Sequence, residues 1–119
     1  MDKLFKEESQ KIKIYMTTEV ETDPYEHTVE HTNLNPLPIR ALIADLTPSQ
    51  LNWKMPGIAT ESAKELIIEK KYRSLLEKSY WIEIDGDKYE GWKINGRMQM
   101  KQIGKDYLRV YVYLSKVEN

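Results

Sequence analysis

The two histidines have the spacing that most resembles a metal-binding or catalytic pattern. His27 and His31 lie four residues apart in the near-repeat EHTVEHT. Two histidines on one face of a strand can bind a metal ion together with a carboxylate from Glu26 or Glu30. No third ligand follows at a suitable spacing, and histidines in polar segments usually lie at the surface. We therefore interpret the segment as a solvated edge strand and expect no bound metal.

Other residue types that could do chemistry give weaker patterns. Asp85 and Asp87 flank Gly86, and paired carboxylates can exchange protons, but this spacing is also typical of a turn. The GxSxG and HExxH motifs and the glycine-rich phosphate-binding loop do not occur. Cysteine is absent, which excludes disulfides, thiolate metal sites and cysteine nucleophiles. We therefore expect no cofactor, and a protein that is not an enzyme.

Composition indicates one ordinary folded domain spanning residues 1–119. The chain is 40% hydrophobic and 31% charged, which is the globular range. Its 18 basic residues balance 19 acidic ones, whereas dedicated nucleic-acid binders usually carry a basic excess. No apolar run reaches the roughly 20 residues of a membrane span, and the N-terminus lacks the apolar centre of a signal peptide. We expect a protein without a membrane partner, made in a cytoplasm.

Alternating apolar residues and turn signals predict a mainly β protein. Three strands are expected in the first half of the chain: Lys11–Thr22, His27–Thr32 and Ile39–Leu46. In the first of them, Ile12, Ile14 and Met16 share one face. Residues 1–10 are expected to form an N-terminal arm or short helix, with Leu4 and Phe5 as its apolar pair. A helix this short is unstable alone, so it must dock on the domain or on a partner.

The last third of the chain gives the clearest strand pattern. Asp85-Gly86 and Asn95-Gly96 separate alternating runs, and both pairs are strong hairpin signals. In the final run, one face carries Leu108, Val110, Val112 and Leu114, and the other carries Tyr107, Arg109, Tyr111 and Tyr113. Successive antiparallel strands of this kind predict a small antiparallel β-barrel with a long inter-strand loop and one or two short helices.

The face with the tyrosines and Arg109 has several interpretations. Aromatic residues beside an arginine could stack nucleic-acid bases. We favour a second packed face or a candidate subunit interface, because Tyr and Arg are enriched where proteins meet.

Residues 47–63 combine large apolar side chains with residues that break regular structure. Thr47-Pro48 is a plausible helix start, and Pro56-Gly57 would end that helix. Long loops with large apolar groups are usually functional. The candidate assembly residues are Leu51, Trp53, Lys54, Met55, Pro56, Gly57 and Ile58. They can fold back as a lid over the barrel, bind another chain, or divide between the two roles.

Several segments together resemble a known protein family. They are IRALIADLTPSQLNWKMPGI, SAKELIIEKKYRSLLEKS, IEIDGDKYEGW and DYLRVYVYL, and they cover Ile39–Leu114. They resemble short proteins encoded in phages and prophage-like elements of Gram-positive bacteria. That family is similar to the head-closure, or stopper, proteins of tailed phages, which are small β-barrels that form a ring below the portal and adaptor.

The resemblance implies a structural virion protein of the phage neck. It implies a homo-oligomeric ring of six or twelve copies, with an adaptor protein on the head side and a tail terminator or tail tube protein on the tail side. Double-stranded DNA would pass through the channel, and the ring would help to retain the packaged genome. Residues 47–63 would face the channel or neighbouring subunits. From the residues alone, Glu61–Ser79 has the propensity and charge of a helix, although Leu66–Tyr72 can also form a strand. The resemblance favours a strand for Glu65–Tyr72, followed by a turn at RSLLEKS.

Two other functions stay open: another neck component, such as a tail-completion or terminator protein, and a small-barrel nucleic-acid-binding module. The near-zero net charge suits a conduit, because a strongly basic ring would grip the phosphates. We expect a physical barrier built from residues 51–60 to retain DNA, with little contribution from Lys54, the only positive charge between Pro48 and Ala63. Replacing Trp53 and Met55 together is expected to spare folding and to impair assembly.

Overall fold

Strands dominate the residues that the computed structural model describes, which are 2–23, 28–33, 36–58, 60 and 62–115. The first half contains α1 (Asp2–Glu8), β1 (Gln10–Asp23), β2 (Thr28–Asn33), β3 (Leu37–Asp45), α2 (Pro48–Lys54) and β4 (Ala63–Glu69). The second half contains the 3-10 helix η1 (Lys70–Tyr72), α3 (Arg73–Glu77), β5 (Ser79–Ile84), β6 (Asp87–Gly91), β7 (Lys93–Ile94), β8 (Arg97–Met98), β9 (Met100–Ile103) and β10 (Tyr107–Leu114). None of the helices within these ranges is long and apolar enough to cross a membrane.

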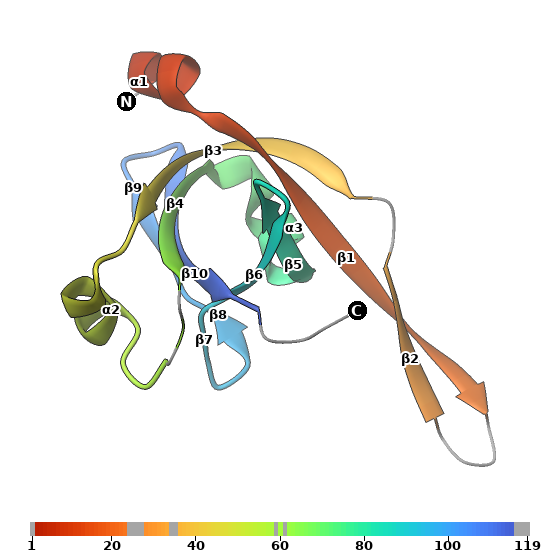
Figure 1. Cartoon of the computed structure of the whole chain (residues 1–119). Helices are drawn as coiled ribbons and strands as arrows, with labels where there is room; N and C mark the ends of the chain where they lie inside the picture. Colours follow the sequence, from red (N-terminus) through yellow and green to blue (C-terminus); the bar gives the residue numbers. More distant parts are fainter. Residues whose placement is uncertain (1, 24–27, 34–35, 59, 61, 116–119) are drawn as a thin grey trace.

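Six antiparallel strands close into a barrel (Figure 1). Their order is β1-β3-β4-β10-β6-β5, and β5 pairs back with β1. Ile14 of β1 lies opposite Leu37 of β3 on one side and Ile82 of β5 on the other. Closure leaves no barrel strand with an unpaired edge, which is the usual solution for a small sheet. The predicted fold class, a small antiparallel β-barrel with a long inter-strand connection and short helices, is confirmed.

The barrel interior is filled by alternate residues of its strands. In β10 the predicted apolar face points inward, and Leu108, Val110 and Val112 are fully buried. Leu76 of α3 is also fully buried and packs into the same core, so α3 covers one opening of the barrel. Burying each of these side chains stabilises the fold by about 1.5–3 kcal/mol. The core is thus built from residues far apart in the sequence.

Both predicted hairpin turns are present. Asp85 and Gly86 have φ values of 51° and 86° and join β5 to β6. Asn95 and Gly96 have φ values of 53° and 78° and join β7 to β8. Two successive positive φ angles define the turn whose twist matches that of the flanking strands, which explains the Asx-Gly pairs.

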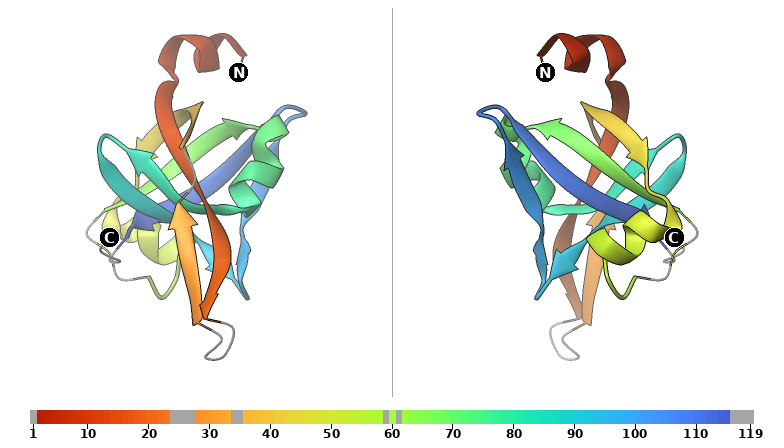
Figure 2. Two further views of the ribbon diagram at one scale, coloured as in Figure 1. Left: turned by 90° about the vertical axis from the view of Figure 1, so that its right-hand side faces the viewer. Right: turned by 90° about the vertical axis from the view of Figure 1, so that its left-hand side faces the viewer.

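The second half of β1 leaves the barrel and pairs with β2. We name this two-stranded piece, Thr17–Asp23 with Thr28–Asn33, the ribbon. Figures 1 and 2 show it projecting beyond the barrel at one end of the molecule while α1 lies at the other end. The molecule measures 53 Å along its longest axis but only 29 and 26 Å along the others. The predicted return strand is confirmed as β2, at the edge of the sheet.

The residues considered above as metal ligands are described only in part. Glu26 and His27 lie outside the described residues, and for Glu30 and His31 only the backbone is described. In the described part of the chain, no group of three or more histidine, aspartate or glutamate side chains could hold a metal ion.

The region after β4 differs from the prediction. We expected a strand over Glu65–Tyr72 and then a turn, but β4 ends at Glu69 and the chain continues as η1 and then α3. The amide of Lys70 donates to the carbonyl of Asp106 at 2.7 Å, which is the last bond of the ladder with the β10 side. Beyond it the chain turns so that Tyr72, Leu75 and Leu76 pack on the core. The helix-forming residues of RSLLE therefore form a helical turn over the barrel opening.

Candidate functional site

The connection between β3 and β4, residues 46–62, leaves and re-enters the barrel at neighbouring points. Asp45 lies opposite Lys64 in the sheet, and the amide of Leu46 donates to the carbonyl of Ala63 at 2.9 Å. The Lys64 ammonium also donates to the carboxylate of Asp45, and this hydrogen bond raises the pKa of Lys64. The connection is therefore closed at its base and lies on the outer surface of the barrel.

Local sequence explains why α2 forms within this connection. Thr47 caps the helix: its hydroxyl accepts from the amide of Gln50 at 3.2 Å, while the Gln50 side chain accepts from the amide of Thr47 at 2.9 Å. Pro48 occupies the first turn, where its missing amide hydrogen costs nothing. Gly57, with a φ of 85°, follows the helix end and reverses the chain. The predicted helix start and stop are both confirmed.

Contacts from Lys54 and Met55 fasten α2 to the barrel wall. Met55 is fully buried. The Lys54 ammonium lies 3.1 Å from Oε2 of Glu65 and 5.4 Å from the ring centre of Tyr111. The other carboxylate oxygen of Glu65, Oε1, lies 2.7 Å from Nε of Arg109. The two side chains form an ion pair, but their geometry is not that of a hydrogen bond. The Glu65 side chain is only 16% exposed, so salt screens these pairs less than it screens surface pairs.

Trp53, by contrast, points away from the barrel and is 85% exposed. Leu51 and Ile58 are half-buried, and Pro56 and Gly57 are exposed. The candidate assembly residues therefore divide between two roles: some pack against the barrel and others are exposed for contact with another chain. Tryptophan is among the residue types enriched at the positions that dominate the binding energy of protein interfaces.

This division corrects one expectation. Replacing Trp53 and Met55 together was expected to spare folding, but Met55 belongs to the buried interior. Only Trp53 can be removed without opening a cavity.

Much of the outer face of β10 is covered by the chain itself. Phe5 of α1 packs on Tyr107, with ring centres 5.2 Å apart, and the Tyr107 hydroxyl donates to Asp2 at 2.6 Å. Arg109 pairs with Glu65 of β4, Tyr111 lies under the ammonium of Lys54, and Tyr113 is half-buried. The interpretation as a second packed face is confirmed for Tyr107, which is 8% exposed. A subunit interface at this face stays a prediction.

The short N-terminal helix docks on the domain, as expected for a helix that is too short to be stable alone. Of its expected apolar pair, only Phe5 is buried: the Phe5 side chain is 6% exposed and Leu4 is 50% exposed.

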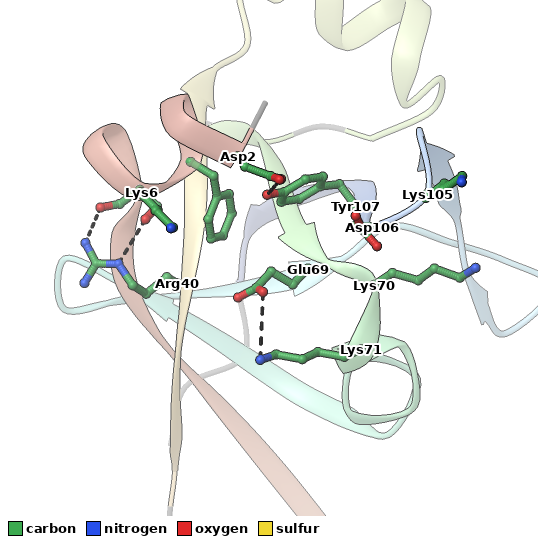
Figure 3. Close-up of a pocket in the computed structure, with 11 residues that line it drawn as sticks. Asp2, Lys6, Arg40, Glu69, Lys70, Lys71, Lys105, Asp106 and Tyr107 are labelled. Carbon is green, nitrogen blue, oxygen red and sulfur yellow. Dashed lines mark hydrogen bonds and ion pairs between the residues drawn. The ribbon is translucent and has the colours of Figure 1, made fainter.

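A pocket of about 820 Å³ lies between α1, η1 and the β9–β10 turn (Figure 3). We name it the basic pocket. It is lined by Asp2, Phe5, Lys6, Ser9, Arg40, Glu69, Lys70, Lys71, Lys105, Asp106 and Tyr107. Five of these residues are basic and three are acidic. The sequence did not reveal this pocket, because its cations come from four separate segments that only the fold brings together.

The pocket's own acidic groups cancel only part of its positive charge. Asp2 accepts the hydrogen bond from Tyr107, and Glu69 lies 3.8 Å from the ammonium of Lys71. Arg40 bonds the hydroxyl of Ser9 at 2.9 Å and the Ser9 carbonyl, both neutral groups. The pocket is therefore suited to an anionic partner.

The Trp53 helix and the basic pocket both adjoin β10, since Lys54 lies over Tyr111 and Tyr107 lines the pocket. No protein-family model, curated protein or solved structure matches the chain. The function must therefore be inferred from the geometry of these two surfaces.

We predict that Met55→Ala destabilises the protein strongly and that Trp53→Ala leaves its stability almost unchanged. Met55→Ala should lower the free energy of unfolding by about 2–5 kcal/mol, because it leaves a cavity. Trp53→Ala should change it by less than about 0.5 kcal/mol, because the side chain is exposed. Urea denaturation of the two variants beside the wild type measures both effects. Equal losses would show that Trp53 packs on the barrel in solution.

We predict that Tyr107 ionises at a higher pH than an ordinary tyrosine. Its hydrogen bond to Asp2 raises the pKa of Tyr107 to about 12, whereas an unfolded tyrosine ionises near 10. The bond's contribution to stability is thus complete below about pH 10 and is lost as the pH rises towards 12. Phenolate absorbance during an alkaline titration measures the step. Tyr107→Phe should delete it and Asp2→Asn should move it towards pH 10; a titration unchanged by either variant would contradict the contact.

Proposed function

We propose that the chain is a structural protein of a tailed-phage neck, of the head-closure kind. In this proposal copies of the barrel form a ring between the adaptor and portal end of the DNA-filled head and the tail, and the ring helps to retain the genome. The chain contributes contact surfaces and carries out no catalysis. The proposal agrees with the resemblance of Ile39–Leu114 to that family, whose expected barrel fold is observed.

The observation that carries the proposal is the exposed Trp53 on an anchored helix. Burial of one large apolar side chain is worth about 1.5–3 kcal/mol, and in a ring the gain repeats in every copy. Because Lys54 and Met55 fix α2 to the barrel, Trp53 is presented at a defined position. A partner therefore pays little to order the helix, which favours assembly over loose contact.

The same segment is suited to forming a barrier. Residues 51–60 include Gly57 with a positive φ and the exposed Pro56, so the backbone changes direction beyond the fastened helix. Lys54 is engaged by Glu65 and Tyr111, and its ammonium is thus not a free cation for phosphates. In the proposed ring this segment narrows the channel by its bulk.

Trp53→Ala is predicted to leave heads and tails unjoined in the phage or prophage-like element that encodes the chain. The variant protein should fold normally, yet each contact in the ring loses its apolar anchor. Electron microscopy counts of joined and unjoined particles measure the effect. Asn52→Ala is the matched control, because Asn52 is the exposed neighbour on the same helix. Wild-type joining in the Trp53 variant would contradict the role given to this side chain.

Retention of DNA is predicted to depend on the bulk of residues 51–60 more than on the charge of Lys54. A chain shortened within 56–60 should give joined particles that lose their genome, while Lys54→Gln particles should keep it. Packaged DNA protected from nuclease is the quantity to measure. The reverse result, leakage with Lys54→Gln and retention with the shortened chain, would replace the barrier with an electrostatic grip.

A further inference from the structure

The charges of the chain are separated between its two ends. No lysine or arginine occurs between Lys13 and Arg40, whereas that interval contains five acidic residues. Four of them, Glu19, Glu21, Asp23 and Glu30, lie on the described strands of the ribbon. The near-zero net charge is therefore the sum of a strongly acidic ribbon and an excess of positive charge on the rest of the chain.

The basic pocket holds much of that positive excess. Within the described residues, Lys6, Lys70 and Lys105 make no ion pair, and Arg40 bonds only neutral groups of Ser9. Figure 3 shows Lys6 and Arg40 on one side of the pocket and Lys70 and Lys105 on the other. The exposed lysines are free to turn towards a bound carboxylate.

The ribbon cannot reach the pocket of its own chain. Strand β1 runs unbroken from Gln10, next to α1, to Asp23 in the ribbon, and 14 extended residues cover about 46 Å. Figure 2 shows α1 and the ribbon at opposite ends of the molecule. Any contact between the two surfaces must therefore join different copies.

We infer that the acidic ribbon of one copy docks into the basic pocket beside α1 of the next copy. The two surfaces differ, so the contact is heterologous, and repetition of such a contact closes into a ring or extends as a filament. Beyond Met16 the ribbon projects by about 23 Å, which is enough to span to a neighbour. Docking also covers a two-stranded element that is marginally stable by itself in water.

The pocket suits the ribbon better than it suits a DNA backbone. Duplex DNA presents one phosphate charge per about 1.7 Å of axis, and such a row would also meet Glu69 and Asp106, which line the same pocket. The mixed charge of the pocket therefore favours a partner with few, spaced negative groups.

The test is a zero-length carbodiimide cross-link between carboxylates and lysines in the purified chain. Equal amounts of ¹⁴N-labelled and ¹⁵N-labelled protein are mixed, cross-linked and mapped by mass spectrometry, so that mixed-isotope peptides report only contacts between copies. We expect ribbon carboxylates to be joined to Lys6, Lys70, Lys71 or Lys105, several times more often than to Lys93, an exposed lysine on β7. The yield should fall severalfold in 1 M salt, where the Debye length is about 3 Å.

Charge exchange provides the matched control. Glu19→Lys with Glu21→Lys, and separately Lys70→Glu with Lys71→Glu, should each abolish the mixed-isotope links, with unchanged thermal unfolding as evidence of folding. Mixing the two exchanged proteins should restore the links with their polarity reversed. Links to Lys93 as frequent as links to the pocket would overturn the inference. An absence of mixed-isotope links at about 1 mM protein would also overturn the inference. It would do so even if the protein bound duplex DNA with a salt-dependent affinity that the Lys70→Glu, Lys71→Glu variant lost.

The inference names the subunit partner within the proposed function, and its ring-forming consequence rests on that function. The cross-link needs no phage particle, so the two can fail separately. If particles need the chain but no ribbon-to-pocket link forms, the ring uses another surface. If the link forms but particles lacking the chain are normal, the contact is real and the proposed function is wrong.

Discussion

The structure depends on the pairing of β1 with strands on both of its sides. Ile14 lies between Leu37 and Ile82, where β3 and β5 would otherwise be the two free edges of an open sheet. This pairing closes the barrel and encloses the core. It also fixes the two ends of the molecule, because α1 precedes β1 and the ribbon continues it. The basic pocket and the acidic ribbon are thus held apart by one continuous strand.

A second constraint acts on the outer wall of the barrel. Strand β10 has an inner face of buried aliphatic residues and an outer face of aromatic residues with Arg109, of which Tyr107 is buried and the others are half-buried. Helix α1 covers one end of the outer face through Phe5 and Tyr107. Helix α2 is fastened at the other end through Lys54 and Glu65. Each of these two short helices is too short to be stable alone. Each is held in place by its contacts with the outer surface of the barrel.

The sequence predicted those features that local chemistry determines. The Asx-Gly turns follow from their need for positive φ, the capping box at Thr47 from its hydrogen bonds, and the inner face of β10 from strict alternation. The end of β4 was missed, because the packing of Leu76 on the core determines it and that contact is not local. For the same reason, the sequence could not say that Met55 is buried while Trp53 is exposed.

The candidate surfaces show the same limit. The acidic ribbon could have been read from the absence of lysine and arginine between Lys13 and Arg40. The basic pocket could not, since Lys6, Arg40, Lys70 and Lys105 are distant in the chain and meet only because β3, β4 and β10 are neighbours. A balanced net charge is therefore compatible with strong local complementarity between copies.

The central claim is that this barrel is a ring subunit at the head–tail junction, and a cryo-electron microscopy reconstruction of the neck of purified particles tests it most directly. The account predicts a ring of barrels between head and tail, with the ribbon of each copy against the α1 end of the next and Trp53 covered by a neighbouring chain. Purified, infectious particles whose neck contains no copy of this chain would contradict it.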